Sequence, residues 1–134
     1  MPTHAQMIEQ FDTHYRLGED SMDETHHEFL QLCVQTLSAR GEQFADRFAT
    51  LLEHTRSHFA QEEARMRSSA FPSSAEHYMD HQRILGEMDR FNQRVHEGRS
   101  TMARAWLADS LSSWFDLHAK TMDSALAAHL KDQN

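Results

Sequence analysis

Apolar residues recur every three or four positions through four long segments of the chain, which is the period of an amphipathic helix. Residues 1–20 show no clear period, and we expect them to form a short N-terminal arm lying on the helices. Gly41 stands where the first helix should end. The pattern predicts helices at about 21–40, 42–68, 73–97 and 101–130.

Polar residues mark the expected starts of two of these helices. Ser21 with Glu24, and Ser73 with Glu76, have the spacing of a capping box, in which the serine side chain and the glutamate satisfy free backbone N–H groups. Asp23 is a rival N-cap, which leaves the start of the first helix open by two residues.

Four helices joined by short turns pack as antiparallel neighbours. We therefore predict an all-α fold, an up-down-up-down antiparallel four-helix bundle with a short N-terminal arm. The length of 134 residues is that of a single domain, 1–134. Such a chain buries roughly 70% of its unfolded surface on folding. The few glycines and prolines, four and two, favour a few long elements over many short ones.

The charge and the cysteine content narrow the classes of partner and compartment. A net charge of -8 argues against binding to nucleic acid or to an anionic membrane surface. Cys33 has no second cysteine to pair with, which favours a reducing compartment. Residues 1–10 lack the features of a secretory signal, and no apolar stretch approaches the ~20 residues of a membrane span. We expect a soluble cytoplasmic protein with no nucleic-acid or membrane partner.

Histidine is the unusual component, with eleven copies. Several replace the Leu or Phe that the helical stripes would otherwise supply, and pairs such as His77 and His81 lie one above the other on a helix face. Buried polar groups without partners each cost on the order of a few kcal/mol, against a usual total stability of ~5–15 kcal/mol. The stripes of all four helices contribute such groups. The candidate metal ligands are His26, His58, Glu62, His77, His81, His118 and Asp123.

Taken singly, most of these residues have a simpler interpretation. His26 alone would be a hydrogen-bonded core histidine. Asp123 follows His118 by five residues and lies about 140° away from it around an ideal helix, so only a local π-type turn would bring it to the core. His54, one turn before His58, is a weaker candidate for contact with metal. The joint occurrence on four consecutive stripes is what favours a metal centre.

The types and number of ligands favour two ions. Imidazole and carboxylate groups suit iron, manganese or zinc, and a single cysteine excludes a thiolate zinc site. Seven ligands exceed the needs of one ion. Two ions that share two bridging carboxylates would use all seven and leave open positions for a small molecule.

Four segments together have the pattern H…HxxxE…HxxxH…HxxxxD. They read MDETHHEF at 22–29, HTRSHFAQEEARM at 54–66, FPSSAEHYMDHQRIL at 71–85 and SSWFDLHAKTMDSAL at 112–126. In these segments the chain closely resembles the hemerythrins, and within them the short bacterial hemerythrin-like domains. The similarity extends over nearly the whole chain from residue 17 onward.

The resemblance implies a non-haem di-iron site that binds O₂ at the iron with fewer histidines. It implies reversible O₂ binding for storage, delivery or sensing, and no enzymatic activity. The alternatives are a di-iron redox enzyme acting on O₂, peroxide or nitric oxide, and a redox- or O₂-sensing signalling module. The implied ligands are His77, His81 and His118 for one iron, His26 and His58 for the other, and Glu62, Asp123 and an oxo or hydroxo group as bridges.

Other plans for a metal site fit the chain less well. A ferritin-like site needs two ExxH motifs, and Glu24 to His27 is the one such motif here. The HExxH motif of zinc proteases does not occur.

The surroundings of the ligands allow a few further expectations. Asp80, where the family often has Glu, should face solvent or lie just outside the ligands, and Glu63 should be solvated. The candidates for an apolar lining, all one turn from a ligand, are Phe29, Thr55, Leu111 and Trp114. Residues expected on the surface are His4, His14, His96 and His129.

Overall fold

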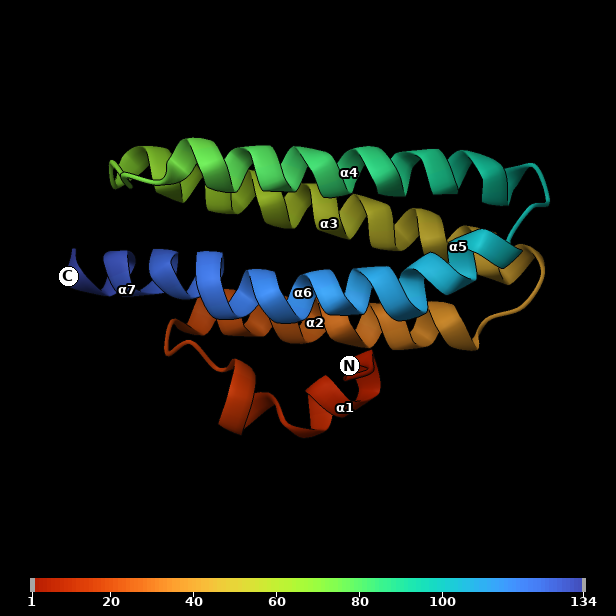
Figure 1. Cartoon of the computed structure of the whole chain (residues 1–134), viewed down its shortest axis with the longest axis horizontal. Helices are drawn as coiled ribbons and strands as arrows, with labels where there is room; N and C mark the ends of the chain where they lie inside the picture. The colour runs from red at the N-terminus through yellow and green to blue at the C-terminus, as the bar shows by residue number, and fades with distance from the viewer. Residues whose placement is uncertain (1, 134) are drawn as a thin grey trace.

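Four long helical runs form an antiparallel bundle in the computed structural model, which describes residues 2–133 (Figure 1). The first three are α2 (Asp20–Ser38), α3 (Glu42–Ser68) and α4 (Ser74–His96). The fourth is a continuous run of segments: α5 (Thr101–Ala105), η2 (Trp106–Leu111), α6 (Ser112–His118), η3 (Ala119–Asp123) and α7 (Ser124–Asp132). Consecutive runs point in opposite directions, so the predicted up-down-up-down four-helix bundle is confirmed.

The predicted helix ends lie within two residues of the observed ones, but both predicted capping boxes are wrong. The side chain of Glu19 accepts a hydrogen bond from the N–H of Met22 at 2.7 Å, so α2 begins before Ser21. Ser73 is the N-cap of α4 but makes no side-chain capping bond. Its φ of -96° and ψ of 24° are not the extended values from which a capping side chain reaches the first turn.

The N-terminal arm is helical and packs along α2 (Figure 1). It consists of α1 (His4–Glu9), which Thr3 caps, and a π turn, η1 (Phe11–Tyr15). The elements are too short to give a clear period in the sequence, although their apolar residues bury against the bundle. His4 is also buried, with its Nε2 2.8 Å from the carbonyl oxygen of Leu107, so the prediction that it lies on the surface is wrong.

The apolar core is divided into two clusters along the bundle axis. The larger one includes Phe29, Phe59 and Phe115, and the smaller one contains Met22, Met66 and Leu126 at the end where α7 finishes. The predicted metal ligands occupy the intervening turns of the helices. The fold therefore surrounds one buried polar layer with apolar side chains above and below. No helix among residues 2–133 is both long and apolar enough to cross a membrane.

Candidate metal centre

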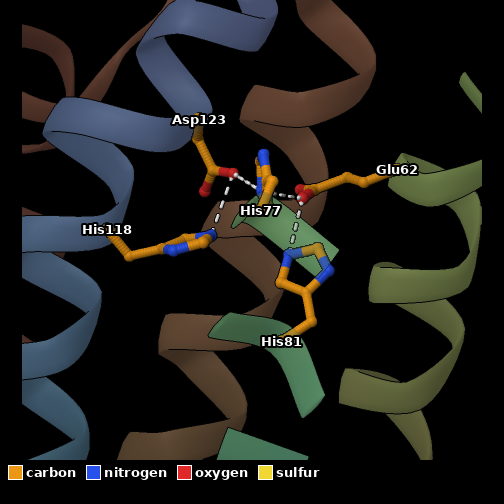
Figure 2. Close-up of side chains that lie close together, drawn as sticks. All are labelled: Glu62, His77, His81, His118 and Asp123. Atoms are coloured by element: carbon orange, nitrogen blue, oxygen red, sulfur yellow. Dashed lines mark ion pairs between the residues drawn. The ribbon is translucent and has the colours of Figure 1, made fainter. Parts of the chain in front are cut away.

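All seven predicted ligands converge in the interior of the bundle. Each is at most 6% exposed, although together they are five imidazoles and two carboxylates. Figure 2 shows five of these side chains, which reach from α3, α4 and the C-terminal run toward a common point. Two groups have their ligand atoms within 4.8 Å of one another: Glu62, His77, His81, His118 and Asp123, and then His26, His58 and Glu62.

Glu62 belongs to both groups because its two oxygens face different histidines. Its Oε1 lies 3.3 Å from Nε2 of His77 and 3.2 Å from Nε2 of His81 (Figure 2). Its Oε2 lies 3.5 Å from Nε2 of His26 and also contacts Nε2 of His58. This is the arrangement of a carboxylate that can bridge two ions.

Asp123 divides its oxygens in the same way. Its Oδ1 lies 3.1 Å from Nε2 of His77 and 3.2 Å from Nε2 of His118 (Figure 2). Its Oδ2 lies 3.0 Å from Nε2 of His26. The π turn η3 makes this possible, because the wider turn brings residue i+5 onto the face that i+4 occupies in an α-helix. The local π turn considered for His118 and Asp123 is therefore present.

The unsatisfied atoms of the cluster test whether these residues fit metal ions. Among residues 2–133, no hydrogen-bond partner exists for Nε2 of His26, His77, His81 and His118, or for one oxygen of each bridging carboxylate. Buried polar atoms are rarely left this way. Ligands about 2.1 Å from an ion and at right angles to one another lie about 3 Å apart. The observed separations agree with that value, so the residues fit a pair of metal ions.

In the protein without metal, histidines of the cluster bind protons more tightly than a free histidine does. Burial alone lowers the pKa of His26, but the attraction of Asp123 and Glu62 outweighs it and raises the pKa to about 10. The balance for His118, beside Asp123 and Asp80, is the same and raises its pKa to about 9. Burial raises the pKa of Glu62, but the surrounding histidines outweigh this and hold it well below its ordinary value.

Metal binding should therefore release protons, and its stabilising effect should increase with pH. The pKa values of His26 and His118 are raised by folding, so their contribution to the stability of the metal-free protein is complete below pH 6.5 and is lost as the pH rises through 9 to 10. The same protons compete with metal at low pH.

The check is the melting temperature with Zn²⁺ and with a chelator between pH 6 and 9, together with calorimetry in buffers of different ionisation enthalpy. We expect a widening gap between the two melting curves and release of at least about two protons per chain near pH 8. A gap that does not change with pH would contradict this assignment of the protons.

Two carboxylates outside the cluster hold ligand histidines by their second nitrogen. Nδ1 of His81 lies 2.9 Å from Oε2 of Glu63, and Nδ1 of His118 lies 2.7 Å from Oδ2 of Asp80. The hydrogen bond from His118 holds the pKa of Asp80 well below its usual range. The prediction that Glu63 is solvated is wrong, because its side chain is 15% exposed. Asp80 was expected either to face solvent or to lie just outside the ligands, and the structure shows the second of these positions.

Aromatic rings stack on the same two histidines. The Phe59 ring lies parallel to His81 with centroids 3.8 Å apart. The Trp114 ring stacks on His118 at 4.5 Å, and its Nε1 donates to Asp80 at 2.9 Å. Trp114 was a predicted lining residue, whereas Phe59 was missed because it directly follows a ligand and the predicted stripe was only one residue wide.

Phe115 is a second lining residue that the sequence pattern did not identify. Its ring meets His26 edge-on at 5.4 Å, and Phe29 stacks on Phe115 at 5.3 Å. Leu111 and Thr55 are fully buried, and the Thr55 hydroxyl donates to a backbone carbonyl of its own helix.

His54 lies outside both groups of ligand atoms. Its Nε2 is 3.3 Å from a carboxylate oxygen of Glu28, and its ring centre is 6.4 Å from that of His58. The hydroxyl of Tyr15 donates to Asp116 at 2.5 Å and not to a ligand.

Comparison with known proteins agrees with this geometry. The family model described as the hemerythrin HHE cation binding domain matches residues 17–130. The chain belongs to the hemerythrin family. The hemerythrin match includes all seven residues of the cluster and leaves the helices of the N-terminal arm outside it.

A curated relative of this hemerythrin-family chain is a bacteriohemerythrin from Ralstonia nicotianae (strain ATCC BAA-1114 / GMI1000). The two are 28% identical over 114 residues, which is 85% of this chain and 82% of the relative. No solved structure matches the chain.

Proposed function

We propose that this chain holds two non-haem iron ions and binds O₂ reversibly. The observation that carries the proposal is the division of oxygens by Glu62 and Asp123 between a group of three histidines and a group of two. Family membership and the name of the relative support iron as the metal. In this proposal His77, His81 and His118 would hold one iron and His26 and His58 the other, with Glu62, Asp123 and an oxo or hydroxo group as the shared ligands.

The unequal numbers of histidines favour one side of the cluster for the binding of O₂. An iron pair supplies the two electrons and the open coordination position that O₂ requires. The side of the cluster with His26 and His58 has one donor nitrogen fewer than the other side, so an ion held there would keep an open coordination position. The Phe115 ring next to His26 gives that side of the cluster an apolar surface.

A small opening reaches the same side of the cluster. It has a volume of about 20 Å³, and its lining includes two of the ligands. One water-sized molecule needs about 10–15 Å³, so the opening has room for a molecule of diatomic size. Arg65, one of its lining residues, pairs with Glu19 at 2.8 Å. The lining residues are Ser21, Met22, Thr25, His58, Gln61, Glu62 and Arg65.

Rapid mixing of the reduced, iron-loaded protein with O₂ tests the proposal. We expect an oxygenated absorption spectrum that is stable over minutes and reverts under vacuum. Rapid conversion to the oxidised protein with steady consumption of a reductant would contradict reversible binding and would indicate a redox enzyme. Azide binding to the oxidised protein serves as a control that the open coordination position is present.

We also propose a domain organisation, a cellular location and a class of partner that the protein does not bind. Residues 1–134 form one domain, whose location is the cytoplasm, where the buried free thiol of Cys33 stays reduced. The charge of -8 disfavours nucleic acid as a partner.

A further inference from the structure

Hydrogen bonds from outside the cluster are distributed unequally between the two groups of histidines. In the three-histidine group, His81 and His118 each have Nδ1 within hydrogen-bond distance of a carboxylate. In the two-histidine group, Nδ1 of His26 and Nδ1 of His58 have no partner among residues 2–133. Nδ1 of His77 also has no partner among residues 2–133. Two histidines of the three-histidine group are therefore hydrogen-bonded to an outer carboxylate, and neither histidine of the two-histidine group is.

Asp80 is itself firmly placed. One of its oxygens is 2.7 Å from Nδ1 of His118 and accepts from Nε1 of Trp114 at 2.9 Å. Its other oxygen accepts from the guanidinium of Arg83 at 3.2 Å. Three groups from two helical runs therefore orient this carboxylate, which in turn fixes the ring of His118.

Ring stacking follows the same division. Phe59 covers His81 with planes only 3° apart, and Trp114 covers His118 with planes 22° apart. By contrast, the aromatic contact of His26 is edge-on, with an interplanar angle of 89°. The two histidines with carboxylate partners are thus also the two that are clamped face to face.

Both effects favour metal binding on one side. A carboxylate on Nδ1 selects the tautomer with Nε2 free to bind metal and increases the basicity of that nitrogen. A ring already held in its binding orientation loses less conformational entropy when the ion arrives. The histidines of the other group, of which His58 lies at the small opening, have neither advantage.

We infer that the two metal positions are unequal, with the three-histidine position filled first and released last and the two-histidine position exchangeable, and that Glu63 and Asp80 are the positioning residues responsible. This inference rests on the proposed di-iron function and adds an order of assembly to it. A chain with one ion at the three-histidine position is then a stable intermediate.

Release of iron to a chelator measures the inequality. The reduced, iron-loaded protein is mixed anaerobically with excess ferrozine, and the coloured Fe²⁺ complex is followed with time. We expect two phases of equal amplitude, one iron each, at least about tenfold apart in rate. His58→Ala should retain one iron per chain, which leaves at the rate of the slow phase.

Variants of the outer carboxylates identify the cause. Asp80→Asn and Glu63→Gln should speed the slow phase by about 10- to 100-fold and leave the fast phase unchanged, since loss of an outer partner weakens metal binding by that factor. Asp80→Glu keeps a carboxylate and should restore slow release, which loss of folding alone would not explain. Glu53→Gln on α3 removes an exposed carboxylate that pairs with Arg56, and should release iron as the parent protein does.

The possible results separate this inference from the proposed function. A single phase containing both irons in the parent protein would overturn the inference alone, as would equal acceleration of both phases in Asp80→Asn. A protein that folds but takes up no iron would overturn the proposed function as well.

Discussion

Replacing Glu62 with alanine should empty both metal positions. Glu62 is the one side chain that lies in both groups of ligand atoms, so its loss removes a donor oxygen from each ion and the link between them. Loss of an outer hydrogen-bond partner already weakens metal binding by about 10- to 100-fold. Loss of a bridging ligand should exceed the upper end of that range. The measurements are iron per chain and the visible absorption of the oxidised protein.

Two variants control for volume and for proximity. Glu62→Gln preserves the size of the side chain but not its charge, and should also fail to hold the iron pair. His54→Ala removes an imidazole whose ring centre is 6.4 Å from that of His58, yet it should keep the full iron content. Equal losses from Glu62→Ala and His54→Ala would show that the ligands have been assigned wrongly. Circular dichroism of the metal-free variants reports whether they fold.

Moving the second bridging carboxylate by one residue should be as damaging as deleting it. In the double variant Met122→Asp with Asp123→Met, the carboxylate follows His118 by four residues, the normal spacing for one helix face. The π turn η3 places residue 123 on that face instead, while Met122 lines a pocket that Phe71 and His77 also line. We expect the double variant to lose iron to the same extent as Asp123→Ala.

The comparison of these two variants tests whether the π turn, and not only the presence of a carboxylate near His118, determines metal binding. Both are assayed for iron content, and their melting curves are compared without metal. If the double variant held two irons, the helix would have changed to ordinary α geometry around the site, and the π turn would not determine the position of the bridge.

Much of the bundle follows from local pattern. The stripes of apolar residues in α2, α3 and α4 predicted helix ends to within two residues, since an amphipathic helix is defined by residues close in the chain. The capping boxes were wrong because a cap depends on the path of the chain before the helix, as Glu19 shows for α2. The arm shows no clear period in the sequence because α1 is too short to give one.

The ligands and their surroundings differed in how far they could be predicted. The i, i+4 spacing predicted that His58 and Glu62 share one helix face and that His77 and His81 share another, and the joint occurrence of such groups on four stripes made them candidate ligands. The hydrogen bonds of Glu63 and Asp80 to histidines were not predicted, because each residue adjoins a candidate ligand in the sequence but points to a histidine on another helical run. No spacing within one helix encodes a hydrogen bond between two.

The sequence by itself determined that four helices would each bring donor groups to a buried stripe, because helical periodicity and the cost of burying unpaired polar groups both act locally. Only the tertiary structure decided how those donors divide between two positions. That division depends on which oxygen of Glu62 or Asp123 faces which helix, and on which imidazoles receive a carboxylate from outside. Such facts arise from the packing of segments far apart in the chain, where a shift of one turn would give the same pattern and a different site.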